Sequence, residues 1–324
     1  MATYKGIQGY SVQKLSDDPT ASEAVGQLWY NSTLGKFKIA VSAAGAWAAG
    51  GNLNTARQHL IGAGTQTAGL AGFGNADPPV TADTEEYNGT TWTEVNNGNS
   101  ARYSATGCGT QTAALACAGN DPTNPVSYTG IVEEYDGTSW TETGDLNTAR
   151  FYPGALGITT AALCAGGEGA PGPATANSET FNGTTWTEGN NQNAALAGRG
   201  GAGTTTAGLM FGGDPGGVGN TETYDGTSWA EVNNLNTGRA KIAGCGIQTA
   251  ALGAGGAGSE NETELYNGTS WTETGDMASG IQARSAAQAG TNAVAMVFGG
   301  GPPKTAATEE FNDPFYTIKT VTVS

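Results

Sequence analysis

The stretch Glu-Glu-Tyr-Asn-Gly-Thr-Thr-Trp at residues 85–92 decides the fold, because close copies of it return along the chain. The copies lie at 133–140, 179–186, 222–229 and 264–271, and a decayed copy, Glu-Glu-Phe-Asn-Asp-Pro-Phe-Tyr, lies at 309–316. Asn-Gly and Asp-Gly favour positive φ at both central turn positions, while aromatic residues and Thr favour strands. Each copy therefore predicts a tight hairpin with a type I′ turn.

Six of the seven tryptophans recur at intervals of 42 to 48 residues, which gives the repeat its period. They are Trp47, Trp92, Trp140, Trp186, Trp229 and Trp271. Ten residues after most of them comes an arginine: Arg57, Arg102, Arg150 and Arg239. Arg284 lies 13 residues after its Trp, and the fourth copy has Leu196 at the usual position. Between one Trp and the next, the pattern predicts four short strands, a to d, in which the Arg opens strand a and the hairpin joins c to d.

The repeat resembles the Kelch repeat. The matching features are an acidic and aromatic pair, a Trp about six residues later, and a double glycine that closes strand b at 166–167, 212–213, 255–256 and 299–300. The first two copies carry Phe73-Gly74 and Ala118-Gly119 instead. The resemblance covers residues 47–324 and implies an all-β protein, a β-propeller of six Kelch-like four-stranded repeats.

Ring closure leaves two alternatives. Residues 27–31, 36–41 and 46–50 look like three strands, and residues 317–324 like a fourth. Pairing of these N- and C-terminal strands would give a ring of seven blades, which we favour. Alternatively, the strand of Trp47 completes a ring of six. The expected domains are an anchoring arm at 1–26 and the propeller at 27–324.

Composition limits both the core and the partners. Glycine makes up 53 of 324 residues and charged residues only 13%, so burial must come from thin layers of aromatic rings against Ala and Gly. The net charge of −16 argues against nucleic-acid binding, which needs a basic surface. No run of 18 apolar residues predicts insertion into a membrane.

Catalytic and metal-binding patterns are not found. His59 is the one histidine and opens strand a, where a structural surface role is expected; one His supplies neither a His-based metal site nor a Ser-His-Asp triad. Without CxxC spacing, the cysteines are expected to be free, buried thiols: Cys108, Cys117, Cys164 and Cys245. We expect no enzyme, no metal and no cofactor.

The recurring arginines are expected to form a structural ring by pairing with strand-c glutamates such as Glu85 and Glu133. The b–c loops escape the repeat, vary in length and emerge on one face of a propeller. They are the candidate recognition face, with neutral drift of exposed loops as the alternative. Its candidate residues are Asn75, Asp77, Asp121, Asn124, Tyr128, Glu168, Asp214 and Asn261.

Residues 26–38, Gly-Gln-Leu-Trp-Tyr-Asn-Ser-Thr-Leu-Gly-Lys-Phe-Lys, resemble hairpins that precede fibre or propeller modules in phage virion proteins. The resemblance implies a tail fibre, or a tail or head appendage, that recognises a host surface or glycan or decorates the virion. It would bind other virion proteins through the arm and act in many copies. The absence of an apolar signal-peptide core fits folding in the host cytoplasm. A bacterial extracellular lectin-like or scaffold propeller remains the alternative.

Overall fold

Strands are the only regular secondary structure in the computed structural model over the residues that it describes, which are 12–19, 24, 26–42, 44–76, 80–123, 128–169, 172–257, 261–283, 285–313 and 316–321. The chain forms two compact units. Unit 1 combines Met1–Gly45 with Asp313–Ser324, and unit 2 is Ala46–Asn312.

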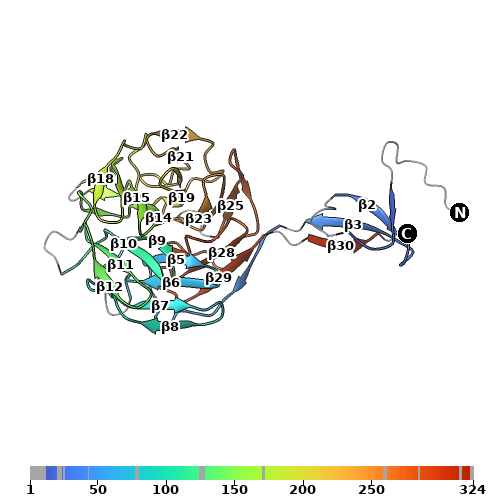
Figure 1. Ribbon diagram of the computed structural model, residues 1–324, viewed down its shortest axis with the longest axis horizontal. Helices are drawn as coiled ribbons and strands as arrows, with labels where there is room; N and C mark the ends of the chain where they lie inside the picture. The colour runs from blue at the N-terminus through green and yellow to red at the C-terminus, as the bar shows by residue number, and fades with distance from the viewer. Residues whose placement is uncertain are drawn as a thin grey trace. The chain divides into compact units, whose positions relative to one another are not determined.

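Unit 2 contains six four-stranded antiparallel sheets among its described residues (Figure 1). Sheet 1 is β5 (Ile61–Thr65), β6 (Ala68–Gly72), β7 (Thr84–Tyr87) and β8 (Trp92–Val95). Sheet 2 is β9 (Thr106–Thr110), β10 (Ala113–Cys117), β11 (Val132–Tyr135) and β12 (Trp140–Glu142). Sheet 3 is β14 (Gly154–Ile158), β15 (Ala161–Ala165), β17 (Ser178–Phe181) and β18 (Trp186–Glu188).

The remaining sheets follow the same plan. Sheet 4 is β19 (Gly200–Thr204), β20 (Ala207–Phe211), β21 (Thr221–Tyr224) and β22 (Trp229–Val232). Sheet 5 is β23 (Ala243–Ile247), β24 (Ala250–Ala254), β25 (Thr263–Tyr266) and β26 (Trp271–Glu273). Sheet 6 joins β27 (Ser285–Ala286), β28 (Val294–Phe298) and β29 (Thr308–Asn312) to the early strand β4 (Ala46–Ala49). Two short strands, β13 (Arg150–Phe151) and β16 (Glu168–Gly169), pair beside sheet 3.

The first strand of each sheet lies innermost, and the tryptophan-bearing strands β8, β12, β18 and β22 lie at the outside (Figure 1). Each inner strand contacts the inner strand of the next sheet, in the order β5, β9, β14, β19, β23 and β27, and β27 contacts β5. The sheets therefore follow one another around a common centre, and the last packs against the first. This is a propeller-like arrangement.

Thin apolar layers fill the spaces between consecutive sheets, as the composition predicts. Between sheets 1 and 2, Phe73 and Trp140 pack against small residues such as Ala63, Ala114 and Ala116. Between sheets 6 and 1, Trp92 and Phe298 pack with a ring-centroid distance of 4.9 Å. Glycine allows such close approach: a Cβ on Gly62 would lie 2.2 Å from the Ala286 carbonyl oxygen.

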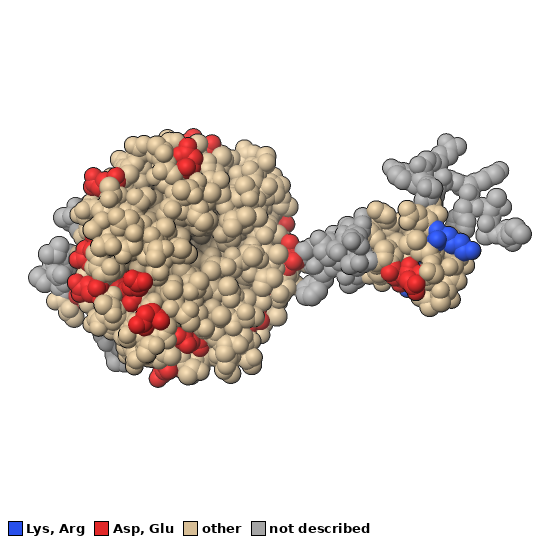
Figure 2. All heavy atoms as spheres, viewed as in Figure 1, with Lys and Arg blue, Asp and Glu red and all other residues tan. Residues whose placement is uncertain are grey.

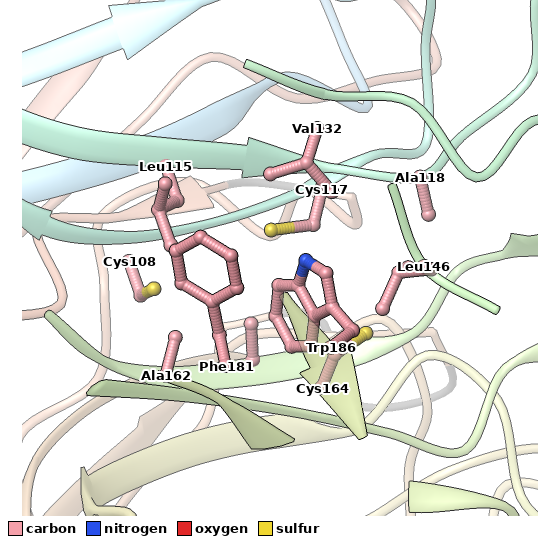
Figure 3. Packing of buried hydrophobic residues seen from close by; sticks show 11 residues of the cluster. Cys108, Leu115, Cys117, Ala118, Val132, Leu146, Ala162, Cys164, Phe181 and Trp186 are labelled. Carbon is pink, nitrogen blue, oxygen red and sulfur yellow. The ribbon is translucent and has the colours of Figure 1, made fainter. Parts of the chain in front are cut away.

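The three cysteines of the layer between sheets 2 and 3, Cys108, Cys117 and Cys164, are buried and free (Figure 3). Cys245, between sheets 5 and 6, is buried and free as well. Burial raises the pKa of Cys108 and of Cys164 to about 12, and it raises the pKa of Cys117 as well. These thiols stay protonated and act as small apolar residues, which confirms the prediction.

Five of the six repeat tryptophans donate a hydrogen bond to the preceding sheet or its connector, and Trp186 is the exception. Trp140 Nε1 donates to Thr84 Oγ1 at 3.0 Å, and equivalent bonds join Trp92 to Thr308, Trp271 to Thr221 and Trp47 to Thr263. Trp229 donates instead to the Asn190 carbonyl oxygen at 3.0 Å. The hydroxyl at the first position of strand c is therefore the usual acceptor in these links.

A buried glutamate holds each of sheets 1 to 5 to the connector that leads into it. In sheet 2, Glu133 accepts bonds from Arg102 and from the backbone and side-chain nitrogens of Asn99, the latter two at 2.7 and 2.8 Å. The same network recurs around Arg57 and Glu85, Arg150 and Glu179, and Arg239 and Glu264. The predicted pairing of arginines with strand-c glutamates is confirmed for these residues.

In the fourth repeat, Arg199 takes the place that sequence analysis left to Leu196. Arg199 lies 13 residues after Trp186 and pairs with Glu222 at 2.8 Å, while Asn193 caps the same carboxylate. A side chain from three residues further along the connector thus reaches the same buried carboxylate. Arg284 has this spacing too, but it lies outside the described residues.

The predicted type I′ turn between strands c and d is wrong. At Asn88-Gly89, φ is positive at Gly89 (90°) and not at Asn88. Four residues connect Tyr87 to its partner Trp92, and Asn88 Oδ1 accepts bonds from the N–H groups of Thr90 and Thr91 at 3.0 and 2.9 Å. The Asn or Asp is needed here because its side chain caps the backbone, not because it adopts positive φ.

Unit 1 overturns the interpretation with a seventh blade. Its sheet runs β1 (Gln13–Leu15), β2 (Leu28–Asn31), β3 (Lys36–Ser42) and β30 (Tyr316–Thr320), with a small core of Ala24, Trp29 and Ala40. The N- and C-terminal strands do pair, as β3 with β30, but in a unit separate from the six sheets. Val321 is 38% exposed, and Val323 lies outside the described residues.

The chain therefore divides differently from the expected boundaries. Residues 27–45 and 313–324 belong to unit 1, and only Trp47 and its neighbours in β4 join the six sheets. Most of the expected arm at 1–26 lies outside the described residues, and β1, which lies in its described part, pairs in parallel with β2.

Charge is divided unevenly between the units. The sequence of unit 2 holds 25 Asp and Glu against 8 Lys and Arg, a net charge of −17, whereas unit 1 holds 4 against 5, a net charge of +1. Five of the eight cations of unit 2 are arginines buried in the glutamate networks. On the face drawn in Figure 2, Asp and Glu are the only charged residues visible on unit 2, and the visible cations lie on unit 1.

Candidate functional site: the axial cavity and its rim

One residue in each connector from strand d to strand a has a left-handed backbone, with φ between 52° and 65°. We call these six residues the left-handed ring; they are His59, Ser104, Tyr152, Gly198, Lys241 and Ala283. Each lies at the same place in its repeat, two residues after the position of the recurring arginine. Such φ values are uncommon for residues other than glycine, so the position is under strong structural constraint.

Backbone hydrogen bonds join the left-handed ring from sheet to sheet. The N–H of Ser104 donates to the carbonyl oxygen of His59 at 2.9 Å, and that of Tyr152 donates to Ser104 at 3.1 Å. The chain of bonds continues from Gly198 to Tyr152 at 2.9 Å, from Lys241 to Gly198 at 2.7 Å, and from His59 to Ala283 at 3.3 Å. The fold thus fixes the backbone here, while Gly198 and Ala283 show that it does not require a particular side chain.

A cavity of about 100 Å³ lies at the centre of unit 2, inside the left-handed ring, and residues of all six sheets or their connectors line it. None of the described residues that line it is an Asp or a Glu. A second cavity, of about 340 Å³, is lined by the ends of the inner strands and includes the exposed side chains of Ile158 and Ile247. Gln288 borders both cavities and donates to the Ala155 carbonyl oxygen at 2.7 Å.

His59 lines the axial cavity and is half-buried, so the predicted surface role is wrong. Its Nε2 lies 2.8 Å from the Tyr152 hydroxyl. Burial, helped by the charge of Lys241, lowers the pKa of His59 to about 4, so the imidazole is neutral at pH 7. With Tyr152 as the donor, the imidazole proton lies on Nδ1, which is buried and has no hydrogen-bond partner among the described residues.

The Tyr152 phenol stays protonated, and its hydroxyl donates to His59 Nε2 or accepts from it according to the tautomer of the imidazole. Burial raises the pKa of Tyr152, and the charges of Glu168 and Asp214 raise it further, while the nearby Ser104 hydroxyl offsets part of the rise. Glu168 and Asp214 therefore lie near the cavity without lining it.

Two cationic residues, Lys241 and Arg199, belong to the lining of the cavity. Lys241 Nζ lies 5.4 Å from the centroid of the Tyr152 ring and forms no salt bridge with a described carboxylate. Arg199 is neutralised by Glu222, but its Nε is buried without a partner among the described residues. Lys241 is thus the cavity's uncompensated positive charge.

Aromatic rings that are only half-buried gather beside the cavity, and we call them the aromatic rim: Tyr103, Tyr128, Phe151 and Tyr152. Tyr128 stacks on Phe151 with a centroid distance of 5.2 Å and an interplanar angle of 6°. The centroid of the Phe151 ring also lies 4.2 Å from that of Tyr152 and 5.9 Å from that of Tyr103. Partly exposed rings of this kind offer flat surfaces to a ligand.

Several of the predicted loop residues lie on the same side as the left-handed ring, because bridges pair the b–c loops with the connectors. Asn75 pairs with Gln58, Asp214 with Ala197, and Glu168 with Phe151. Tyr128 belongs to the aromatic rim. Asp121 caps its own loop at Thr123, and exposed Asn261 contacts Asp276 at 3.4 Å. Asp77 and Asn124 lie outside the described residues.

Sequence analysis missed the inner members of the site: Ser104, Tyr152, Arg199 and Lys241. A signal existed, because the residue two positions after each recurring arginine reads His, Ser, Tyr and Lys in otherwise similar connectors. Variation at one fixed repeat position, two residues after a recurring structural arginine, marks a place where the fold leaves the side chain free.

Comparison with known proteins shows the fold and no more. No protein-family model matches the chain, and no curated protein does. A solved structure of YjhT is similar with a TM-score of 0.66 and 12% sequence identity, over 83% of this chain and 99% of that one. At this identity the likeness supports the propeller-like fold alone.

No group of three or more His, Cys, Asp or Glu among the described residues is placed to hold a metal ion. The same residues include no helix that is long and apolar enough to cross a membrane.

Proposed function

We propose that this chain is a non-enzymatic structural protein of a phage virion, a tail fibre or a tail or head appendage, which presents unit 2 for recognition of a host surface or glycan. In this proposal unit 1 and the segment at 1–26 contact other virion proteins. The chain folds in the host cytoplasm, and the assembled particle carries it in many copies.

The six sheets in this proposal form a six-bladed propeller that β4 closes. The pairing of β4 with β29, the Trp47 link to Thr263 and the apolar layer between sheets 6 and 1 support this closure. A closed ring has no exposed strand edge at its seam, which suits a protein that works outside the cell.

The observation that carries the recognition role is the concentration of irregular side chains on one side of a regular molecule. The repeats share their tryptophans, glutamate networks and turns, yet around the axial cavity they differ, with His59, Tyr152 and Lys241 at equivalent positions. The b–c loops and the aromatic rim lie on this same side. Half-exposed aromatic rings flanked by carboxylates and amides suit the apolar faces and hydroxyls of sugars.

Binding of the purified protein to a glycan array and to host envelopes tests the recognition role. Phe151→Ala and Tyr128→Ala each remove a stacking surface and should weaken binding by about tenfold, since aromatic contacts of this kind contribute about 1 kcal/mol. Ile158→Ala, at the second cavity, is the matched control and should leave binding unchanged. Equal affinity of all four proteins would contradict the assignment of this face.

Mass spectrometry and immunogold labelling of purified particles test the display role. Detection of the chain in intact virions, lost after deletion of residues 1–26, is the expected result. Detection only on the surface of bacteria that carry no phage would favour the extracellular lectin-like or scaffold protein.

A further inference from the structure

The axial cavity differs in charge from the unit that surrounds it. Unit 2 has a net charge of −17 by sequence, yet the described lining of the cavity contains Lys241 and Arg199 and no carboxylate. A cavity that is lined by positive charge and by no carboxylate attracts anions, even though the unit around it is negatively charged.

Lys241 and His59 both leave hydrogen-bonding capacity unused at the cavity. Lys241 forms no salt bridge with a described carboxylate, although 25 acidic residues belong to its unit. The buried Nδ1 of His59, a residue that lines the cavity, also has no partner among the described residues. Buried donors are normally satisfied, so donors left open around one cavity indicate an acceptor that binds there.

The size of the cavity limits that acceptor. A cavity of about 100 Å³ holds a few atoms or a few water molecules, so it accommodates one small charged group and not a whole sugar ring. The aromatic rim and the carboxylates of Glu168 and Asp214 lie beside it and would contact the remainder of a larger ligand.

We propose that the axial cavity binds a compact oxyanion, the carboxylate or phosphate group of a small molecule or surface polymer, with Lys241 as its counter-charge and with His59, its neutral imidazole protonated on Nδ1, as a hydrogen-bond donor. This inference goes beyond the display role and stands without it. It depends on the cavity alone and applies in solution to the purified chain.

The single histidine makes the test direct, because the imidazole resonances in an NMR spectrum belong to His59 alone. The full chain is titrated with phosphate, glucuronate, glucose 6-phosphate and glucose at constant ionic strength. We expect the His59 resonances to shift with a saturable dependence on at least one of the anions, and not with glucose. The bound anion should also raise the pKa of His59 above its free value of about 4.

Lys241→Gln removes the counter-charge and should weaken anion binding by roughly tenfold to a hundredfold, as expected for loss of a charged hydrogen bond. Lys36→Gln changes the net charge equally at an exposed position of unit 1 and should have no effect. Thermal melting followed by circular dichroism checks that each variant folds. If Lys241→Gln does not fold, Lys241→Met provides the test in its place.

The outcomes separate the possibilities. Saturation by phosphate and glucose 6-phosphate alone identifies a phosphate site, and saturation by glucuronate alone identifies a carboxylate site. A lack of response to every anion, or equal affinity in wild type and the Lys241 variants, would overturn the proposal. Glycan binding that fails while anion binding succeeds would count against the recognition role only.

Discussion

Val132 occupies the one described strand-c position at which a Trp indole of the next sheet finds no hydroxyl or carbonyl acceptor. The equivalent residues are Thr84, Ser178, Thr221, Thr263 and Thr308, whereas Trp186 Nε1 is buried and has no partner. Figure 3 shows this nitrogen facing the side chains of Val132 and Cys117. An unsatisfied buried donor of this kind costs about 1–3 kcal/mol.

Val132→Thr should therefore stabilise the protein by about 1 kcal/mol, because it supplies the missing acceptor at nearly constant volume. The reverse change in the neighbouring repeat, Thr84→Val, should destabilise it by about 1–3 kcal/mol by leaving Trp140 Nε1 unpaired. Urea unfolding followed by tryptophan fluorescence measures both. Destabilisation by both substitutions would show that packing, not hydrogen bonding, decides this position.

His59 adds a pH dependence with a definite sign. Its pKa falls from an ordinary 6.5 to about 4 on folding, so the unfolded chain binds more protons between these values. The stability contributed by neutral His59 is present above pH 6.5 and is lost as the pH falls towards 4. In His59→Gln, the difference in unfolding free energy between pH 7 and pH 4.5 should be smaller than in wild type. An identical difference in both proteins would show that His59 does not titrate in this range.

At the scale of elements, one buried glutamate explains why Asn-Thr-Ala-Arg recurs before strand a. The Asn and the Arg both bind the same buried carboxylate on strand c of their own sheet, as Asn54 and Arg57 bind Glu85. The Asn side chain also donates to the carbonyl oxygen of the Trp on strand d. The connector, strand c and strand d are thus held together at one point in each of these sheets.

Glu133→Gln should destabilise unit 2 by about 3 kcal/mol or more, because it leaves the buried Arg102 without its counter-charge. Glu142 lies directly opposite Glu133 on β12 but is exposed, so Glu142→Gln is the matched control and should change stability by less than about 0.5 kcal/mol. Differential scanning calorimetry of the two variants and wild type measures the contrast. Similar melting temperatures for the two variants would refute the role of the buried network.

The period of the sequence predicts the strands well because each short strand is bounded by a turn with its own chemistry. Tyr87 and Trp92 pair as expected, although the turn between them is of a different type. The error arose because Asn-Gly fits both a two-residue turn and a longer loop capped by the Asn side chain. Composition could not predict the cavity either. The residues that line the cavity are about 45 positions apart in the sequence, and they lie close together only after the six sheets have assembled.

At the scale of the whole molecule, β4 is the element that joins the beginning of unit 2 to its end. The Trp47 and Phe311 ring centroids lie 5.1 Å apart, and Trp47 donates to Thr263, so Trp47 contacts residues more than 200 positions later in the chain. Sequence analysis favoured seven blades because the strands at 27–41 and 317–324 looked incomplete alone. They complete one another, in unit 1.

The segment 46–312, expressed alone, should fold with a single cooperative thermal transition, because its described contacts form a continuous set. Removal of β4, in the segment 50–312, should lower the stability by about 3–5 kcal/mol, the usual range for the loss of a packed tryptophan. Scanning calorimetry of the two segments tests this. Equal transitions would mean that β4 does not close the ring.

Ala46 and Asn312 are direct partners in the pairing of β4 with β29, so the chain enters and leaves unit 2 at adjacent points. The strands on the outer side of these points, β3 and β30, pair with each other as well. Unit 2 is thus an insertion in a small host domain, and the host requires of its insert only that the two ends lie side by side. Under the proposed function, recombination at these two points would exchange one recognition cassette for another and leave the attachment to the particle unchanged.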